Sequence, residues 1–587
     1  MPFYWSLRSV PELGHRSRKE RRQAIWQVGL RPFRHLHVWA ALVVTSFAIL
    51  WGAEAVLGHL LLNPATANTT RGLVLLGLEA AAVVLLSMPL FRHFYLGALR
   101  GYLRHVWFDR TGSWWSAWTR SLLIRLVVTV LFLGCLGGLD WAINSFDEKP
   151  DPRISALLHW PEPIPDQSNG FFAAAGLQAA PGASPFEAGK AWAAAAGEAG
   201  QKHAADYPKP PEELKFVRYE TKPRADAKSG ALDAAARRGT YGQFCTAGAE
   251  QCWKVLQQER NDVQAWVAAN QELLTRYLAL QRYPQWQYAS GTSLPAYTPM
   301  MHGQTLLHAT ALLAMDRKQT AKGLELIGAD IRFARNMLGS KDVLIGKMVA
   351  ATMLSRDLAL LGETLAQRPG DLKPYWAQIE KMVEPLAPDQ VSMADAFRFE
   401  QRWIISVVTQ SGFAQSGMEL PALGATWAEH HFKPNATANL LLVQWDHLLR
   451  RMQARGADSA PFGAQTLSPP QPHLSRWTGF MYNQLGKVFV ATGTFDYREY
   501  ADRLFDLNAL NSLVRLQLAL AEKGVRAKDV PAFLGNGDKS LWNPETGKPY
   551  AWDAERKQVY FAPATDHFSK RLSLGCGVPG RVGLTVM

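Results

Sequence analysis

Residues 38–62 have the sequence VWAALVVTSFAILWGAEAVLGHLLL, which is apolar almost throughout. A helix needs about 20 such residues to cross the hydrocarbon core of a bilayer, which is roughly 30 Å thick. Two further apolar stretches of comparable length follow at 72–91 and 121–143. The three stretches predict three transmembrane helices, which together form a membrane domain over 38–143. A buried helical hairpin is the alternative, because the first stretch contains Glu54 and His59.

Basic residues near the ends of these stretches predict the orientation of the chain in the membrane. Eight Lys/Arg residues lie in the segment 1–37 and five in the loop 92–120, whereas the turn 63–71 has only Arg71. Segments rich in Lys and Arg stay on the cytoplasmic side. We therefore expect the N-terminal segment and the loop 92–120 in the cytoplasm, and the chain from residue 144 onward outside it.

The net charge of +13 is concentrated in the part of the chain nearest the predicted membrane domain. The first 120 residues hold 14 Lys/Arg and 5 Asp/Glu, whereas the remaining 467 hold 49 and 45. This excess indicates membrane topology and attraction to anionic lipid, so the lipid bilayer is the first expected partner. The nearly balanced charge of the rest gives little support to nucleic-acid binding.

The chain after the membrane domain divides into three parts. Residues 144–240 are rich in Pro and Ala and form a connector, with a helix expected at 186–199. Residues 241–522 show apolar residues at three- and four-residue spacing, which predicts helices. These helices are expected at 253–283, 302–315, 319–338, 341–367, 371–384, 389–411, 437–455, 476–493 and 497–522.

The last part, residues 523–587, has the character of a turn followed by a β-hairpin. Its strands are expected around 549–552 and 557–562, after a turn at Pro544–Gly547. The expected fold is therefore mainly α: three N-terminal transmembrane helices, a large irregular helical solenoid or bundle, and a small C-terminal β element.

Three phrases of the outer part carry a resemblance to known sequences. They are YNQLGKVFVA (482–491), REYADRLFDLNALNSLVRLQLAL (498–520) and NPETGKPYAWD (543–553). The outer part resembles proteobacterial inner-membrane proteins that have a helical periplasmic domain. The resemblance implies a bacterial inner-membrane location with the large C-terminal domain in the periplasm. It brings no active-site residues with it.

The cysteines agree with a periplasmic location of the outer part. Six residues separate Cys245 from Cys252, and in an oxidising compartment such a pair predicts a disulfide. A zinc site is the alternative, but no second Cys/His pair has the spacing of zinc ligands. The sequence therefore predicts neither a metal nor a cofactor.

Glu54 and Glu79 form the candidate site within the membrane. With a rise of about 1.5 Å per residue, both are expected roughly 10–12 Å below the outer surface on neighbouring helices. Intramembrane acids often mark proton paths, and two close carboxyls can share one proton. A protonated packing contact among small residues is the simpler interpretation.

Glu400 is the candidate general acid of the outer domain. It lies in the predicted helix 389–411 together with Asp395, Arg398 and Arg402. A peptidoglycan hydrolase would need one carboxyl here with a raised pKa, whereas ion pairs on the helix surface are the simpler interpretation. Other charged residues would line an inward groove if their helices pack together, among them Asp330, Arg335, Arg356 and Asp357.

The histidines give weaker indications. His302 and His308 are six residues apart, which does not place them on one helix face, so capping or buried hydrogen bonds are expected. His430 and His431 are adjacent and must point in different directions, as must Asp446 and His447. Polar contacts are therefore expected for these four residues rather than a metal cluster.

The sequence contains no Gly-x-Ser-x-Gly, His-Glu-x-x-His or phosphate-loop motif. The leading expectation is a non-enzymatic, membrane-anchored binding or scaffold protein of the cell envelope, with another envelope protein as its partner. The first alternative is a cell-wall hydrolase that acts through Glu400. The second is a proton-coupled or transport-associated component that uses Glu54 and Glu79.

Overall fold

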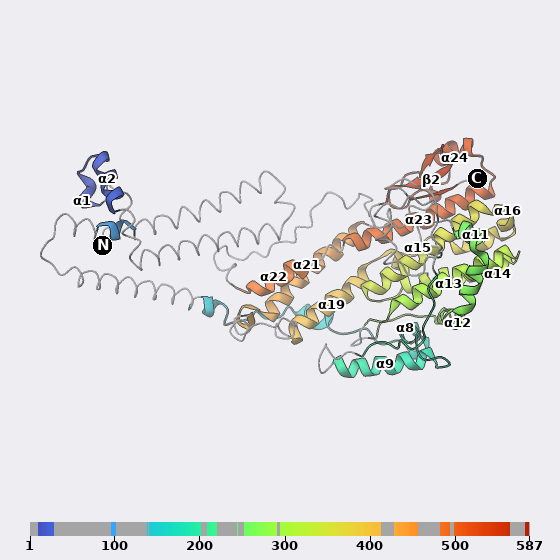
Figure 1. Cartoon of the computed structure of the whole chain (residues 1–587), viewed down its shortest axis with the longest axis horizontal. Helices are drawn as coiled ribbons and strands as arrows, with labels where there is room; N and C mark the ends of the chain where they lie inside the picture. Colours follow the sequence, from blue (N-terminus) through green and yellow to red (C-terminus); the bar gives the residue numbers. More distant parts are fainter. Residues whose placement is uncertain are drawn as a thin grey trace. The chain divides into compact units, whose positions relative to one another are not determined.

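The computed structural model describes twelve parts of the chain (Figure 1). They are residues 10–28, 95–100, 138, 140–200, 208–219, 244, 252–289, 294–411, 428–455, 482–493, 498–563 and 582–585. Helices dominate and strands are few, which confirms the expected mainly α fold class.

The predicted membrane spans lie almost wholly outside the described residues. This holds for all of 38–62 and 72–91, and for 121–143 except residues 138 and 140–143. Across the described parts of the chain, no helix combines the length and the apolar character that crossing a membrane requires. The three spans therefore have no support from the structure and stay a prediction.

The chain divides into two compact units. The first comprises residues 1–151, 407–441 and 466–494, and the second comprises residues 152–406, 442–465 and 495–587. The N-terminal helices α1 (Pro11–Gly14) and α2 (Arg18–Val28) and the helix α22 (Gln484–Gly493) belong to the first unit.

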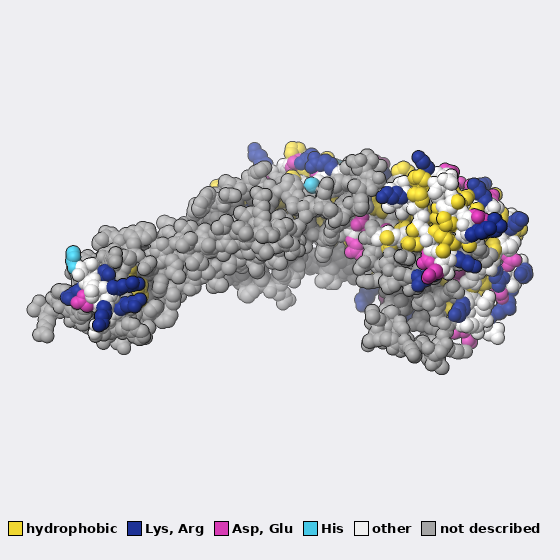
Figure 2. All heavy atoms as spheres, turned by 90° about the horizontal axis from the view of Figure 1, so that it is seen from above, with side chains coloured by type: hydrophobic (Ala, Val, Ile, Leu, Met, Phe, Trp, Pro, Cys, Tyr) yellow, Lys and Arg dark blue, Asp and Glu magenta, His cyan; other side chains and the backbone are white. Residues whose placement is uncertain are grey.

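A capping box fixes the start of α2. The backbone N–H of Ser17 donates to the Glu20 carboxylate at 2.8 Å, and the backbone N–H of Glu20 donates to the Ser17 hydroxyl at 3.3 Å. This reciprocal pair satisfies donors that a helix N-terminus leaves free. Lys and Arg side chains gather over this segment at the left of Figure 2; those on or next to α2 are Arg16, Arg18, Lys19, Arg21 and Arg22.

The second unit begins with the short helices α7 (Pro152–Leu157) and α8 (Gly170–Ala175), followed by α9 (Pro185–Gly200). The helix α9 confirms the helix expected at 186–199. It packs against α8 at backbone distance, because a Cβ atom at Gly176 would collide with the Pro185 carbonyl and one at Gly189 with the Phe172 carbonyl.

Three consecutive long helices form the centre of the second unit. They are α13 (Tyr297–Asp316), α14 (Thr320–Leu338) and α15 (Leu344–Gln367), each packed on the next and joined by short turns (Figure 1). The expected helices 302–315, 319–338 and 341–367 match them closely. α13 begins at Tyr297, five residues before the expected start. Pro299 does not break the helix, because it lies in the first turn, where a missing N–H costs no hydrogen bond.

The expected helix 253–283 is wrong as a single element. It is two helices, α11 (Cys252–Ala269) and α12 (Gln271–Leu280), separated at Asn270. The Asn270 amide donates to the carbonyls of Val217 and Trp266 at 3.0 and 2.9 Å, and its oxygen accepts from the Val217 N–H at 2.8 Å. The side chain thus bonds to backbone groups at the break between the two helices.

The remaining helices are shorter or lie further along the chain. The segment expected to be one helix at 371–384 is broken into α16 (Pro369–Leu372), a 3-10 turn (Lys373–Tyr375) and α17 (Trp376–Met382), because Pro374 lies within it. They are followed by α18 (Pro388–Val391), α19 (Ala394–Ser411), α21 (Pro434–Arg455), α23 (Arg498–Glu522) and α24 (Val530–Asn536).

The C-terminal β element is a three-stranded antiparallel sheet rather than a hairpin. Its strands are β1 (Ala551–Asp553), β2 (Gln558–Phe561) and β3 (Val582–Thr585), in that spatial order. The first two strands lie where the alternation of residues predicts them. The Gln517 amide on α23 donates to the carbonyls of Gly362 on α15 and Thr585 on β3, at 2.9 and 2.8 Å, and so joins the sheet to the helices.

Candidate functional site

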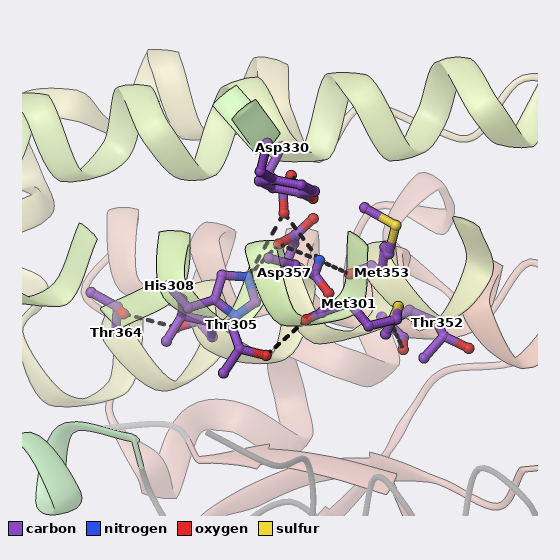
Figure 3. A network of polar contacts seen from close by, with 12 residues as sticks. Met301, Thr305, His308, Asp330, Thr352, Met353, Asp357 and Thr364 are labelled. Atoms are coloured by element: carbon purple, nitrogen blue, oxygen red, sulfur yellow. Dashed lines mark hydrogen bonds and ion pairs between the residues drawn. The ribbon is translucent and has the colours of Figure 1, made fainter. Parts of the chain in front are cut away.

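The helices α12 to α15 bring together a group of polar side chains inside the second unit (Figure 3). We call it the carboxylate–histidine cluster and define it as Gln304, His308, Asp330 and Asp357. Gln304 and His308 are four residues apart and share one face of α13, while Asp330 comes from α14 and Asp357 from α15. Asp330, Asp357 and Gln304 are 0% exposed, and His308 is buried.

Hydrogen bonds from two helices hold the Asp330 carboxyl in place. Its Oδ1 atom accepts from the Tyr277 hydroxyl at 2.6 Å and from the Gln281 amide at 2.5 Å. Its Oδ2 atom accepts from the Gln304 amide at 3.0 Å and lies 3.9 Å from His308 Nε2. One oxygen is thus fixed by α12, while the other faces α13.

The Asp357 carboxyl shares a side-chain hydrogen bond with Asp330, and its two oxygens differ in their other partners. Its Oδ1 atom lies 2.6 Å from His308 Nε2 and 3.2 Å from the Gln304 amide nitrogen. Among the described residues, neither Asp357 Oδ2 nor Gln304 Oε1 has a hydrogen-bond partner, although both atoms are buried. A buried polar atom without a partner costs about 1–3 kcal/mol, so these two atoms need an explanation.

Burial controls the protonation of this cluster. It raises the pKa of Asp357 to about 8 and, with the neighbouring Asp357 charge, raises the pKa of Asp330 well above its ordinary value. Burial also lowers the pKa of His308 to about 4. Each charged form is disfavoured away from water, so without a cation the cluster holds a proton on a carboxyl and a neutral imidazole at neutral pH.

A second polar group, the Asp342 cluster, comprises Asp342, Trp286, Tyr297, Lys347 and Glu400. Asp342 lies in the turn between α14 and α15, and its Oδ2 atom accepts from Trp286 Nε1 at 2.6 Å. Glu400 on α19 accepts from the backbone N–H of Leu344, the first residue of α15, at 3.2 Å. Burial raises the pKa of Asp342 to about 7, and the Glu400 charge contributes in the same direction.

Glu400, the candidate general acid, thus has the raised pKa that the hypothesis required. The cause is burial, partly offset by the hydrogen bond from Leu344. Lys347, also buried, donates to the carbonyls of Leu338 and Asp389 at 2.6 and 2.9 Å, and burial lowers its pKa to about 8. Within the described residues the Tyr297 hydroxyl and Asp342 Oδ1 lack partners, so the Asp342 cluster is incompletely bonded.

Of the other charges near Glu400, Asp395 and Arg398 form the expected surface ion pair, whereas Arg402 bonds to the backbone. Arg398 pairs with Asp395 at 3.1 Å, and both side chains are exposed. Arg402 donates to the Leu157 carbonyl at 2.6 Å. The ion-pair interpretation therefore fits Asp395 and Arg398, but not Glu400.

The remaining histidines make separate polar contacts. His430 stacks on Trp141 with ring centroids 3.6 Å apart, and His431 Nε2 lies 2.7 Å from the Asp140 carboxylate. Asp446 pairs with Arg153 at 2.6 Å. These contacts confirm the expectation of ordinary polar contacts for His430, His431 and Asp446.

Three predicted site residues, Glu54, Glu79 and Cys245, lie outside the described residues. Cys252 begins α11, where the N–H groups of Cys252 and Trp253 each donate to Glu363 at 3.0 Å. The pairing of Cys245 with Cys252 and the coupling of Glu54 with Glu79 therefore stay predictions.

The sequence analysis places Asp330 and Asp357 together in a possible inward groove but does not connect them with His308. The available signal was the presence of polar residues within otherwise apolar helix faces of 302–315, 319–338 and 341–367. Comparison with protein-family models, with curated proteins and with solved structures finds no match for the chain. The site is therefore interpreted from its geometry.

Proposed function

We propose that this protein is a membrane-anchored binding or scaffold protein of the bacterial inner membrane, with its large helical domain in the periplasm and without catalytic activity. The three apolar stretches and the distribution of Lys and Arg support the anchor and its orientation. The observation that carries the scaffold role is an exposed apolar surface around α19.

This α19 surface is formed by Trp160, Ile345 and Trp403, which are 38%, 42% and 54% exposed. Trp160 lies against α19, with its ring centroid 5.1 Å from that of Phe399 and under the Arg402 guanidinium. Ile345 is adjacent because the preceding residue bonds to Glu400. Neighbouring exposed apolar side chains mark interaction sites, and Trp and Arg are enriched among the residues that dominate binding energy.

Photo-crosslinking in cells tests the scaffold role directly. A photoreactive amino acid at position 403 is expected to give an adduct of discrete mass with one envelope protein, because Trp403 is the most exposed of the three side chains. The control position is Val217, which is exposed but lies away from α19 in the sequence. Absence of an adduct at position 403, or the same adducts at both positions, would refute the proposed binding surface.

Membrane fractionation tests the anchor separately. The full chain is expected to remain in the membrane pellet after alkaline carbonate extraction, and its C-terminal domain to be digested by protease added to spheroplasts. Release into the supernatant would refute the anchor, and protection of the domain in intact spheroplasts would refute the orientation.

A second candidate function is cell-wall hydrolysis, which the Asp342 cluster favours. Glycoside hydrolases use two carboxyls, one of which acts as an acid with a raised pKa. Burial raises the pKa of both Asp342 and Glu400, and the Glu400 charge adds to the rise at Asp342. Digestion of purified peptidoglycan by the wild type but not by Glu400→Gln, with Asp395→Asn as the active control, would establish this function in place of the scaffold role.

A further inference from the structure

We propose that the carboxylate–histidine cluster binds one divalent transition-metal ion, with ligands from His308, Asp330 and Asp357. This site is independent of the proposed scaffold role and goes beyond the sequence analysis, which predicts no metal. The three side chains point toward one another from three different helices (Figure 3).

The distances between the donor atoms fit a small cation. One nitrogen or oxygen from each residue lies within 4.8 Å of the others. Bonds of about 2.0–2.2 Å to zinc place neighbouring ligand atoms roughly 3.0–3.5 Å apart. His308 Nε2 is 2.6 Å from Asp357 Oδ1 and 3.9 Å from Asp330 Oδ2, so the distances lie on both sides of this range. Each of these two distances differs from the range by about 0.4 Å.

Two of the buried polar atoms without hydrogen-bond partners among the described residues lie in this cluster. Asp357 Oδ2 has no hydrogen-bond partner within the described chain, and it belongs to a side chain with no exposed surface. The fully buried Gln304 side chain reaches both carboxyls through its amide nitrogen, while its Oε1 atom likewise lacks a described partner. A metal ion would use the free lone pairs of the Asp357 carboxyl.

The surrounding hydrogen bonds orient the ligands as a metal site requires. Tyr277 and Gln281 both donate to Asp330 Oδ1, which leaves Oδ2 directed toward His308. The two N–H groups of the Gln304 amide are shared among the Met353 carbonyl at 2.9 Å, Asp330 Oδ2 at 3.0 Å and Asp357 Oδ1 at 3.2 Å. Such outer contacts fix ligand carboxylates and are a regular part of protein metal sites.

Charge and ligand type indicate the class of metal. Two carboxylates and a neutral imidazole carry a charge of −2, which a divalent ion would neutralise in a space that excludes water. One nitrogen and carboxylate oxygens suit Zn²⁺ or Mn²⁺, whereas Mg²⁺ and Ca²⁺ prefer oxygen ligands alone. The ligands are supplied by three packed helices, so the bound ion would also fasten α13, α14 and α15 together.

Metal analysis of the purified full chain tests this proposal. We expect the wild type, produced in medium containing Zn²⁺ and Mn²⁺, to hold one ion per chain, and Asp357→Asn and His308→Gln to lose it. Glu363→Gln is the matched control, because it makes the same carboxyl-to-amide change on the same helix outside the cluster and should retain the ion. Circular dichroism of each variant shows whether it is folded.

Thermal unfolding gives an independent measurement. Protein produced without added metal is expected to show a higher Tm after addition of Zn²⁺ or Mn²⁺, because a ligand bound by the native state stabilises it. The same addition should leave the Tm of His308→Gln unchanged. The proposal would be overturned if the folded wild type held no stoichiometric metal and showed no increase in Tm. It would also be overturned if the wild type and the folded cluster variants held equal amounts of metal, because that result would mark an adventitious ion only.

Discussion

The substitution Asp342→Asn measures how strongly one buried carboxyl limits stability at neutral and alkaline pH. Asp342 is 1% exposed, and burial raises its pKa from the ordinary 3.8 to about 7. One pKa unit between the folded and unfolded states corresponds to about 1.4 kcal/mol. The difference at Asp342 therefore corresponds to an upper value of about 4 kcal/mol in the free energy of unfolding.

The direction of the effect follows from where the proton is held. The folded state binds the Asp342 proton more tightly than the unfolded chain does, so this contribution to stability is complete below pH 3.8 and is lost as the pH rises to about 7. Asparagine has no charge to bury, and its amide oxygen can still accept from Trp286 Nε1. We expect the variant and the wild type to have similar stability near about pH 4, and the variant to be more stable by up to about 4 kcal/mol near about pH 8.

Urea unfolding of the full chain, followed by circular dichroism at a series of pH values, would give this difference. Asp529→Asn is the control, because Asp529 is an exposed residue paired with Arg526 and should give little difference at any pH. The charges of Lys347 and Glu400 act on Asp342, so the transition can be broader than that of a single group. A wild-type advantage that stays constant from acid to alkaline pH would contradict the reasoning.

Three further substitutions test the packing around this region by urea unfolding. Gly346→Ala should destabilise the protein by about 1–3 kcal/mol, because the new Cβ atom would collide with the Asp342 carboxylate. Gly370→Ala is the control and should be nearly neutral, because its Cβ atom would meet nothing within 4 Å. Equal losses of stability in the two variants would contradict this reasoning. Glu363→Ala should cost about 1 kcal/mol by removing the acceptor for the first N–H groups of α11, and an unchanged midpoint would show that water replaces it. Gln517→Ala should cost about 1–3 kcal/mol and speed proteolysis near β3, because it leaves two carbonyls without their amide donor; unaltered cleavage would contradict this role.

Periodicity in the sequence predicts the long helices but not their interruptions. The helices α14 and α15 differ from their predicted ranges by at most three residues, because apolar residues recur at helical spacing up to a turn. The break at Asn270 was not predictable from spacing, since it depends on hydrogen bonds to Val217, 53 residues away. The strand β3 was missed because it pairs with β2 only after an intervening segment of the chain.

The candidate sites show the same limit. The residue type of Glu400 indicates a potential acid, but its neighbour Asp342 lies in a turn where the sequence predicts the start of a helix. His308 was expected to make a buried hydrogen bond, and it does so with Asp357. The sequence separation of these two residues is 49, so their meeting depends on how α13, α14 and α15 pack and not on any local spacing.

The central position of α15 has a consequence for synthesis of the protein. Its Glu363 side chain bonds to residues 111 positions earlier in the chain, and its Gly362 carbonyl bonds to Gln517, 155 positions later. At roughly 5–20 residues per second, the ribosome needs about 8–30 s to make the chain between Gly362 and Gln517. During that interval the apolar side of α15 that later packs on α23 and β3 has no native cover. Newly made chains therefore pass through a period in which a chaperone that shields apolar segments would raise the yield of folded protein.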